Sequence, residues 1–447
     1  MRRNYDPQSA QSIFQFSRGL LCKSLNEAVS EIGDFIAEEY AASGGKGGLG
    51  QLVERFYYGY TPNSNPGPDF SEAGVELKTT PLKKDSRGEL RIKERLVCDM
   101  IDFCEVVEVP FEQSKFYNKS LLMLILFYLH QKRTDVRDLK FLYSALWRLK
   151  DKDLLIIKHD YEVIVEKIRA GKAHELSEGD TLYLGACRKG QKGDSLRKQP
   201  YSDIGAPRRA FSLKPAYMRN ILAFIQQTGG NMATNTDIPS ACRCELVSKE
   251  ELAQASFEDI LMARLMRFRA QDYKQMGEAL GIRVNPKDKS RYARVTKEAL
   301  MKGLREFEDA EEFRKAGITP KTIRVRADGC VKESMSFENI DYEEVYETGE
   351  WTESRWYEIA TSRFMFVVFR EDPSGAWRGR NALCARQSFF LDDAARGLGR
   401  SGKVLGEHPG KRPGRHVAGR EQYVLEAGRQ TGIPRASQGT EGTRQIL

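Results

Sequence analysis

The chain has 447 residues, 40% of them hydrophobic and 30% charged, with a formal net charge of +8. This length and balance are typical of a globular protein with two or three domains. The longest apolar run, residues 120–129, is too short to cross a bilayer, and the first residues lack the apolar core of a signal peptide. We therefore expect a cytoplasmic protein without a membrane partner.

The positive charge is concentrated near the C-terminus. From residue 375 onward there are 13 Lys and Arg against 6 Asp and Glu, which accounts for +7 of the total of +8. Residues 376–447 are also rich in glycine and arginine and mostly lose hydrophobic periodicity. This tail is either a disordered basic segment that binds DNA non-specifically or a segment translated out of frame. DNA binding by the rest of the chain must depend on local basic clusters.

The remaining chain predicts alternating helices and strands. Apolar residues at helical spacing indicate helices within residues 8–42 and at 49–57. Strands are expected next, and a first domain is expected to end near residue 228. The expected strands are 75–80, 89–93, 105–109 and 121–129; the expected helices are 135–149 and 159–171; and residues 180–214 are expected to form a strand, a long basic loop and a second strand.

Two ionisable residues interrupt the otherwise apolar segment GVELKT. In a strand, Glu76 and Lys78 share one face while their apolar neighbours face the core. Asp69 precedes them across a turn that Gly74 would ease. Two carboxylates can bind a hard divalent cation such as Mg²⁺, and a lysine can offset charge on a phosphate. The set suits phosphodiester hydrolysis; by itself the pattern also fits an ion pair on a strand edge.

Four segments then occur in an order that resembles the MutH/Sau family of DNA endonucleases: KGGLGQLVE, PDFSEAGVELKT, FYNKSLLML and RRAFSLK. The resemblance covers about residues 40–220. This family comprises the mismatch-repair nicking endonuclease MutH and type II restriction endonucleases that cut at GATC. The resemblance implies an α/β fold of the PD-(D/E)xK class, a mixed sheet flanked by helices. It also implies Asp69 and Glu76 as metal ligands, Lys78 as the catalytic lysine, and Glu54 and Lys119 as further active-site residues, for which the alternative is ordinary surface charge.

A basic loop with interspersed glycines, residues 186–199, is the candidate for reading DNA. A flexible basic loop can enter a major groove and donate hydrogen bonds to guanine. The resemblance places the recognition loop here, and the alternative is a solvated charged loop. A second basic cluster surrounds Phe211. The candidate DNA-binding residues are Arg188, Lys189, Lys192, Arg197, Lys198, Arg209 and Lys214.

The sequence also contains an internal repeat. Residues 93–107 align without gaps to 332–346, and residues 70–82 match 313–325 in the same order. We infer two related domains, about 1–228 and 240–375, that arose by duplication. The second copy has Glu312, Thr319 and Lys321 in place of Asp69, Glu76 and Lys78, and its Pro320 is expected to disturb a central strand.

The second domain is therefore expected to be non-catalytic. It would be a MutH-like DNA-binding or effector domain, with a purely structural partner domain as the alternative. Together with these observations, the resemblance implies a Mg²⁺-dependent type II restriction endonuclease acting on double-stranded DNA containing GATC, and a cognate DNA methyltransferase. The alternatives are a MutH-like nicking repair enzyme, which the chain length disfavours, and a non-catalytic DNA-binding protein, which the intact first-copy triad disfavours.

Overall fold

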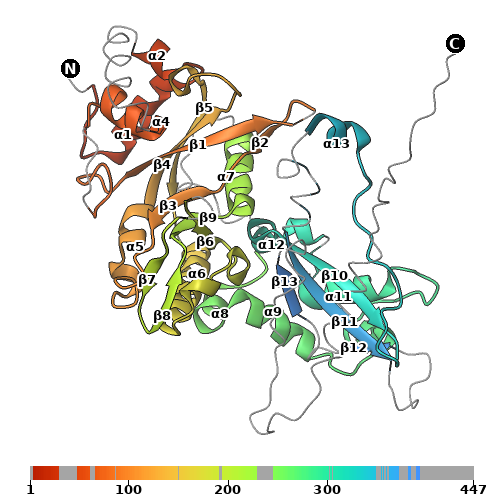
Figure 1. Cartoon of the computed structure of the whole chain (residues 1–447). Coiled ribbons are helices and arrows are strands. Elements are labelled where there is room, and N and C mark those ends of the chain that lie inside the picture. The colour runs from red at the N-terminus through yellow and green to blue at the C-terminus, as the bar shows by residue number, and fades with distance from the viewer. Residues whose placement is uncertain are drawn as a thin grey trace, which may run out of the picture.

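The structure is a computed structural model in which the N-terminal and C-terminal halves lie side by side (Figure 1). The predicted helical stretch beyond residue 29 and the tail beyond residue 392 lie outside the described residues. None of the described helices is long and apolar enough to cross a membrane. The described residues are 4–29, 48–60, 66–85, 87–149, 151–190, 194–228, 245–301, 303–304, 306–348, 354, 356, 359, 362–371, 381–383 and 389–392.

A four-stranded mixed sheet forms the centre of the N-terminal half. Its strand order is β2-β1-β4-β5. β1 runs parallel to β4, whereas β2 and β5 pair antiparallel at the two edges. The strands are β1 (Glu76–Lys84), β2 (Leu90–Ile92), β4 (Leu122–Leu129) and β5 (Phe141–Arg148).

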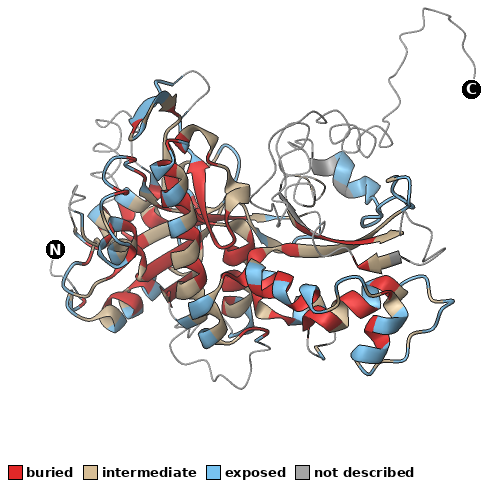
Figure 2. Cartoon of the chain, turned by 90° about the horizontal axis from the view of Figure 1, so that it is seen from below, coloured by how far each residue is buried: buried red, intermediate tan, exposed pale blue. Residues whose placement is uncertain are grey.

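Helices cover both faces of this sheet, because β4 is apolar on both sides. Leu122, Leu124 and Leu126 pack in one hydrophobic cluster with the N-terminal helices. Met123, Ile125 and Phe127 alternate with them and join a larger cluster on the opposite face. Figure 2 shows the resulting buried residues. This arrangement confirms the predicted mixed sheet flanked by helices; the helices are α1 (Ala10–Ser17), α2 (Leu25–Ala28) and α4 (Leu49–Leu52) on the first face, and α6 (Asp151–Arg169) and α7 (Pro215–Gln227) on the second.

A smaller antiparallel sheet lies beside the central one. Its order is β3-β9-β6, formed by Leu96–Met100, Arg209–Leu213 and Leu184–Arg188. Between β6 and β9 the chain forms a separate hairpin, β7 (Arg197–Gln199) and β8 (Ser202–Ala206). The prediction of two strands around a basic loop is confirmed, with the addition of this hairpin.

Two of the predicted elements are wrong. Residues 105–109 form turns rather than a strand, because the Asp102 carboxylate accepts the backbone N–H groups of Cys104 and Glu105. Residues 135–149 form a short 3₁₀ turn, Val136–Asp138, followed by β5 rather than a helix. β5 is buried on both faces for most of its length, so its sequence lacks the two-residue alternation that would have revealed a strand.

The C-terminal half is built from short helices and a second small sheet. The parallel pair β10 (Ile318–Val325) and β11 (Arg363–Glu371) repeats the β1–β4 pair. β12 (Asn381–Leu383) and β13 (Phe389–Asp392) pair with β11, so regular structure continues past residue 375. The helices are α8 (Lys249–Gln254), α9 (Phe257–Met266), α10 (Tyr273–Ala279), α11 (Arg291–Met301), α12 (Glu311–Ala316) and α13 (Tyr342–Thr348).

Pro320 does not disturb β10, contrary to expectation. The strand runs through Pro320, which lies opposite Met365 of β11. Among the described strands β10 pairs only with β11, so it lies at the edge of its sheet. An edge strand tolerates proline because one row of its backbone groups has no ladder partner.

A buried ionic cluster joins the two halves where α12 contacts α7 and α6. The Lys315 ammonium donates to both carboxylate oxygens of Asp153, at 2.7 Å each, and pairs with Glu311 at 2.6 Å. Tyr217 donates its hydroxyl to Asp153 at 2.8 Å. Hydrophobic residues of both halves belong to one cluster around this contact. The division into domains 1–228 and 240–375 remains a prediction.

Candidate active site

A tight turn places the two predicted metal-binding carboxylates side by side. Phe70 and Val75 exchange backbone hydrogen bonds, and Gly74 adopts a φ of 65°, which glycine accepts without strain. The backbone N–H of Asp69 donates to Glu76 Oε2 at 3.2 Å. The backbone N–H of Leu77 donates to Asp69 Oδ2 at 2.9 Å. The turn therefore holds Asp69 against the first residues of β1.

Lys78 lies on the same face of β1 as Glu76, as the strand period predicts. Its ammonium donates to Glu76 Oε1 at 2.7 Å and to the Cys98 carbonyl of β3 at 3.1 Å. Burial by itself would lower the pKa of Lys78, but the surrounding groups, Glu76 first and then Cys98 and Asp69, together raise it. The ammonium therefore remains protonated between β1 and β3.

Glu54 and Lys119 reach the same place from two other elements. Lys119, in the last turn of α5 (Lys115–Ser120), brings its ammonium to 4.0 Å from Glu76 Oε1. Glu54 lies in a π-helical turn, Val53–Tyr57, a distortion often found at functional sites. Burial, followed by the charges of Asp69 and Glu76, raises the pKa of Glu54 to about 7. The five predicted active-site residues are thus brought together.

Negative charge accumulates among these carboxylates. Burial and the neighbouring Glu76 carboxylate raise the pKa of Asp69 to about 6. Within the described ranges no group of three or more His, Cys, Asp or Glu side chains has a ready metal-binding arrangement. The donors nevertheless fit Mg²⁺, because they are carboxylate oxygens and a divalent cation would relieve their mutual repulsion. Asp69 and Glu76 as ligands of such a cation remain a prediction.

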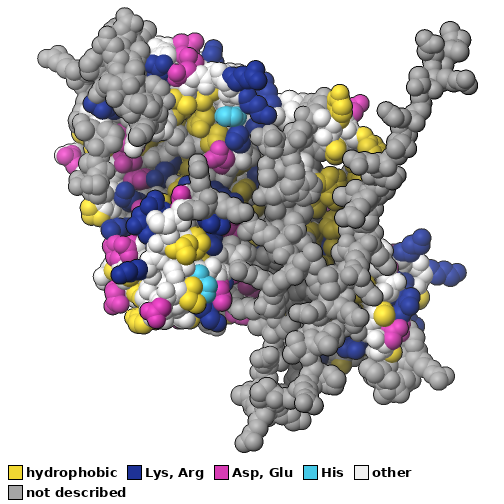
Figure 3. Space-filling model, in the orientation of Figure 1, with side chains coloured by type: hydrophobic (Ala, Val, Ile, Leu, Met, Phe, Trp, Pro, Cys, Tyr) yellow, Lys and Arg dark blue, Asp and Glu magenta, His cyan; other side chains and the backbone are white. Residues whose placement is uncertain are grey.

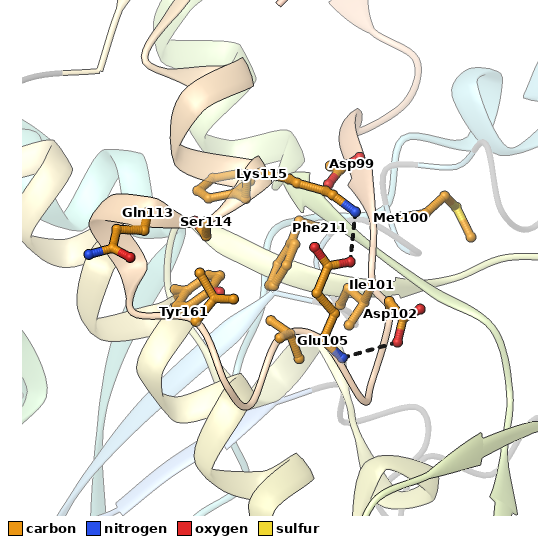
Figure 4. A pocket seen from close by; sticks show the side chains of 13 residues that line it. Asp99, Met100, Ile101, Asp102, Glu105, Gln113, Ser114, Lys115, Tyr161 and Phe211 are labelled. Carbon is orange, nitrogen blue, oxygen red and sulfur yellow. Dashed lines mark hydrogen bonds and ion pairs between the residues drawn. The ribbon is translucent and has the colours of Figure 1, made fainter. Parts of the chain in front are cut away.

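Asp99 is a charged residue near this site that the sequence analysis missed. It follows Cys98 on β3 and lines a small pocket with Glu105 and Lys115 (Figure 4). Glu105 and Lys115 form an ion pair of 2.6 Å across this pocket. Burial raises the pKa of Asp99, opposed first by the charge of Lys119. A lone aspartate gives no signal in the sequence, since only the packing of β3 against α5 brings it to the lysines.

The predicted DNA-binding residues of the β6–β7 region are largely on the surface. Arg188 is exposed at the end of β6, and Arg197 and Lys198 are exposed on β7. Lys189 is half-buried, and Lys192 lies outside the described residues. Arg188, Arg197 and Lys198 are therefore available to an anionic partner.

Arg209 and Lys214 instead make contacts within the fold. The Arg209 guanidinium donates to the Ala186 carbonyl at 3.0 Å and also to the Leu176 carbonyl, and burial lowers its pKa. The Lys214 ammonium donates to the Thr181 carbonyl. These contacts tie Arg209 to β6 and to Leu176, and Lys214 to Thr181, so a DNA-binding role for either residue remains a prediction.

The second copy does not reproduce the carboxylate pair. Glu312, at the position of Asp69, is buried and accepts the backbone N–H groups of Leu246 and Val247 at 3.1 to 3.2 Å. Lys321 donates to the Ser336 carbonyl at 3.1 Å. Thr319, at the position of Glu76, offers no carboxylate.

Known proteins are similar in sequence to the part of the chain that carries these residues. Residues 58–160 match the family described as DNA mismatch repair enzyme MutH, a range that includes Asp69, Glu76, Lys78 and Lys119. The chain is 35% identical to the type II restriction enzyme Sau3AI of Staphylococcus aureus over 344 residues, which is 74% of this chain and 68% of that protein.

The similarity to MutH proteins covers less of the chain. The DNA mismatch repair protein MutH of Shewanella amazonensis is 26% identical over 48% of this chain and 95% of its own length. The MutH protein of Vibrio parahaemolyticus is 25% identical over 48% of this chain and 94% of its own length. The chain therefore belongs to the MutH/Sau family of DNA endonucleases and is an enzyme that acts on DNA.

Proposed function

We propose that the chain is a Mg²⁺-dependent double-strand endonuclease of the type II restriction class that cleaves DNA at 5′-GATC. The observation that carries this proposal is the convergence of Asp69, Glu76, Lys78, Lys119 and Glu54 at the start of β1. The extent of similarity to Sau3AI, 74% of this chain against 48% for the first two MutH proteins compared, supports the restriction class. The recognition sequence rests on the motifs shared with the family.

Each residue of the site has a distinct role in this proposal. Asp69 and Glu76 hold the cation, which would polarise the scissile phosphate and make water a better nucleophile. Lys78 remains protonated between Glu76 and the Cys98 carbonyl, so it can orient the attacking water and offset charge that grows on the phosphate. Lys119 adds a second positive charge beside Glu76.

Glu54 and the DNA-binding residues complete the proposal. Glu54 adds a carboxylate whose pKa is raised to about 7. Arg188, Arg197 and Lys198 are exposed and would contact the duplex. The first domain, 1–228, cuts. The second, 240–375, binds DNA without cutting and acts as an effector module. A cognate DNA methyltransferase would protect the same sites from cleavage.

A second candidate is a nicking enzyme of the MutH type. The match to the MutH family lies in the half that carries the active site. Such an enzyme would cut one strand and would require a mismatch-repair activator. The similarity to Sau3AI extends well beyond this half, so we favour the restriction function.

Digestion of unmethylated plasmid DNA tests the proposal. Supercoiled plasmid is incubated with the chain in Mg²⁺ and, in parallel, in EDTA, and the ends are mapped by sequencing. We expect Mg²⁺-dependent double-strand breaks confined to GATC. Nicks alone would favour the MutH-type function, and cleavage that persists in EDTA or occurs at unrelated sequences would contradict the proposal.

A further inference from the structure

The β7–β8 hairpin exposes an unusual amount of apolar surface. Leu196 is 58% exposed, Tyr201 is 71% exposed and Ile204 is 57% exposed. Single exposed apolar residues are common on protein surfaces. Three large ones on one short hairpin form a local apolar patch, which is a common property of interaction sites.

Tyr201 occupies a position that its residue type disfavours. Pro200 and Tyr201 connect β7 to β8, because Gln199 pairs directly with Ser202. Tyr201 has a φ of 61°. At the second position of a two-residue connection, positive φ favours glycine or asparagine, whereas a tyrosine is strained. Backbone strain of this kind is found preferentially at functional positions.

Contacts with residues 171–174 nevertheless anchor the tip of the hairpin. The buried Gln199 side chain accepts the backbone N–H of Ala173 at 2.7 Å and donates to the Ile204 carbonyl at 2.5 Å. It also contacts His174 Nδ1 at 3.0 Å. At Gly171 a Cβ atom would lie 2.6 Å from the Tyr201 carbonyl oxygen, so only glycine allows this approach. The exposed ring is thus carried by a turn that these contacts anchor to residues 171–174.

The charge around the hairpin indicates what the apolar patch contacts. Lys172, Arg197 and Lys198 are exposed near it, against the exposed acids Asp194 and Asp203. Figure 3 shows hydrophobic side chains next to Lys and Arg on the lobe that carries β7 and β8. Lysine is depleted from protein–protein interfaces. Phosphates, in contrast, attract such residues, and aromatic and apolar side chains pack against bases.

We propose that the tip of the β7–β8 hairpin is a DNA-contacting wedge. Tyr201 packs against a base or between base steps of the bound duplex, and Leu196 and Ile204 add exposed apolar surface elsewhere on the same hairpin. Arg197 and Lys198 contact the phosphates beside it. This inference rests on the proposed function and adds an apolar contact to the basic ones already named.

Two substitutions of Tyr201 and one matched control test the wedge. Tyr201→Asn removes the ring, and asparagine accepts the positive φ. Tyr201→Phe retains the ring. Gln226→Ala is the control, because Gln226 is also exposed and lies on α7 of the same half, outside the hairpin. Affinity for a GATC duplex is measured in EDTA. In a second measurement, 2-aminopurine replaces one base of the duplex at a time, and its fluorescence reports whether that base is unstacked.

We expect Tyr201→Asn to weaken binding about ten-fold, as loss of one stacking contact would, and to reduce the 2-aminopurine signal. Tyr201→Phe and Gln226→Ala should bind within about two-fold of the wild-type chain. Circular dichroism and thermal unfolding verify that all variants are folded.

The wedge and the proposed function can fail separately. If the wild-type chain binds and cuts but Tyr201→Asn binds as tightly, the wedge is wrong and the proposed function stands. A change in oligomeric state, measured by light scattering, without loss of DNA affinity would instead assign the patch to protein contacts. If the wild-type chain neither binds nor cuts GATC DNA, the proposed function is overturned and the wedge with it.

Discussion

The two halves share a framework but differ in their chemistry. In each, a parallel strand pair carries a lysine whose ammonium donates to a backbone carbonyl at 3.1 Å, Lys78 to Cys98 and Lys321 to Ser336. Among the described residues, a carboxylate lies beside that lysine in the first half alone, where Glu76 accepts from Lys78. The lysine therefore has a local structural contact of its own in both halves, so a lysine on this strand does not by itself indicate catalysis.

The halves also differ in how deeply they bury one segment of the repeat, residues 103–107 in the first half and residues 342–346 in the second. Phe103, Val106 and Val107 are buried in the first half, at 3% to 8% exposure. Their counterparts in the repeat, Tyr342, Val345 and Tyr346, are exposed by 79%, 48% and 89%. The described part of the second half does not rebuild the core around this segment.

The largest expected effect is a difference in cleavage rate between variants of Lys78 and of Lys321. Lys78→Ala should reduce the single-turnover cleavage rate by about a thousand-fold or more, because the site loses the charge that would stabilise the transition state. Lys321→Ala should leave the rate within a few-fold, since Thr319 supplies no metal ligand there. Equal losses in the two variants would contradict the division of roles between the halves.

Substitutions in the two copies of this segment should have different effects on the free energy of unfolding. Phe103→Ala should lower the free energy of unfolding by about 3–5 kcal/mol, because it leaves a cavity in the core. Tyr342→Ala should change it by no more than about 0.5 kcal/mol, because its side chain is on the surface. Urea denaturation of both variants provides the measurement, and a large loss in Tyr342→Ala would show that this segment is covered in solution.

The contact between the halves depends on Lys315. Lys315→Met should destabilise the chain by about 3 kcal/mol, because it leaves the carboxylates of Asp153 and Glu311 without their cation in a largely buried site. Adding Asp153→Asn should restore part of the loss. A double-mutant cycle by urea denaturation measures the coupling, and strictly additive effects would show that the pair does not join the halves.

The smallest expected effect concerns the second half as an effector. A plasmid with two GATC sites should be cut a few-fold faster per site than a plasmid with one, since the second half would bind the other site. Cleavage rates at equal site concentration provide the comparison. Equal rates per site would count against a DNA-binding effector role.

Local sequence patterns predicted the centre of the site well. Asp69, Glu76 and Lys78 lie within ten residues, so a turn and the two-residue period of a strand were sufficient to bring them together. Glu54 and Lys119 lie on distant elements and were predicted only through the family resemblance.

Other features depend on tertiary packing that one sequence does not reveal. Arg209 and Lys214 look like surface residues in the sequence, yet they donate to internal carbonyl groups. Asp99 reaches the lysines only because β3 packs against α5. Pro320 is tolerated because β10 lies at the edge of its sheet among the described strands, and strand position within a sheet is set by the fold as a whole.

The most direct test compares Glu76→Ala with Thr319→Ala. Both variants and the wild-type chain are incubated with a GATC duplex in Mg²⁺, and binding is measured separately in EDTA. We predict that Glu76→Ala binds but does not cut, whereas Thr319→Ala binds and cuts like the wild-type chain. Normal cleavage by Glu76→Ala, or loss of cleavage in Thr319→Ala alone, would contradict the assignment of the active site to the first half.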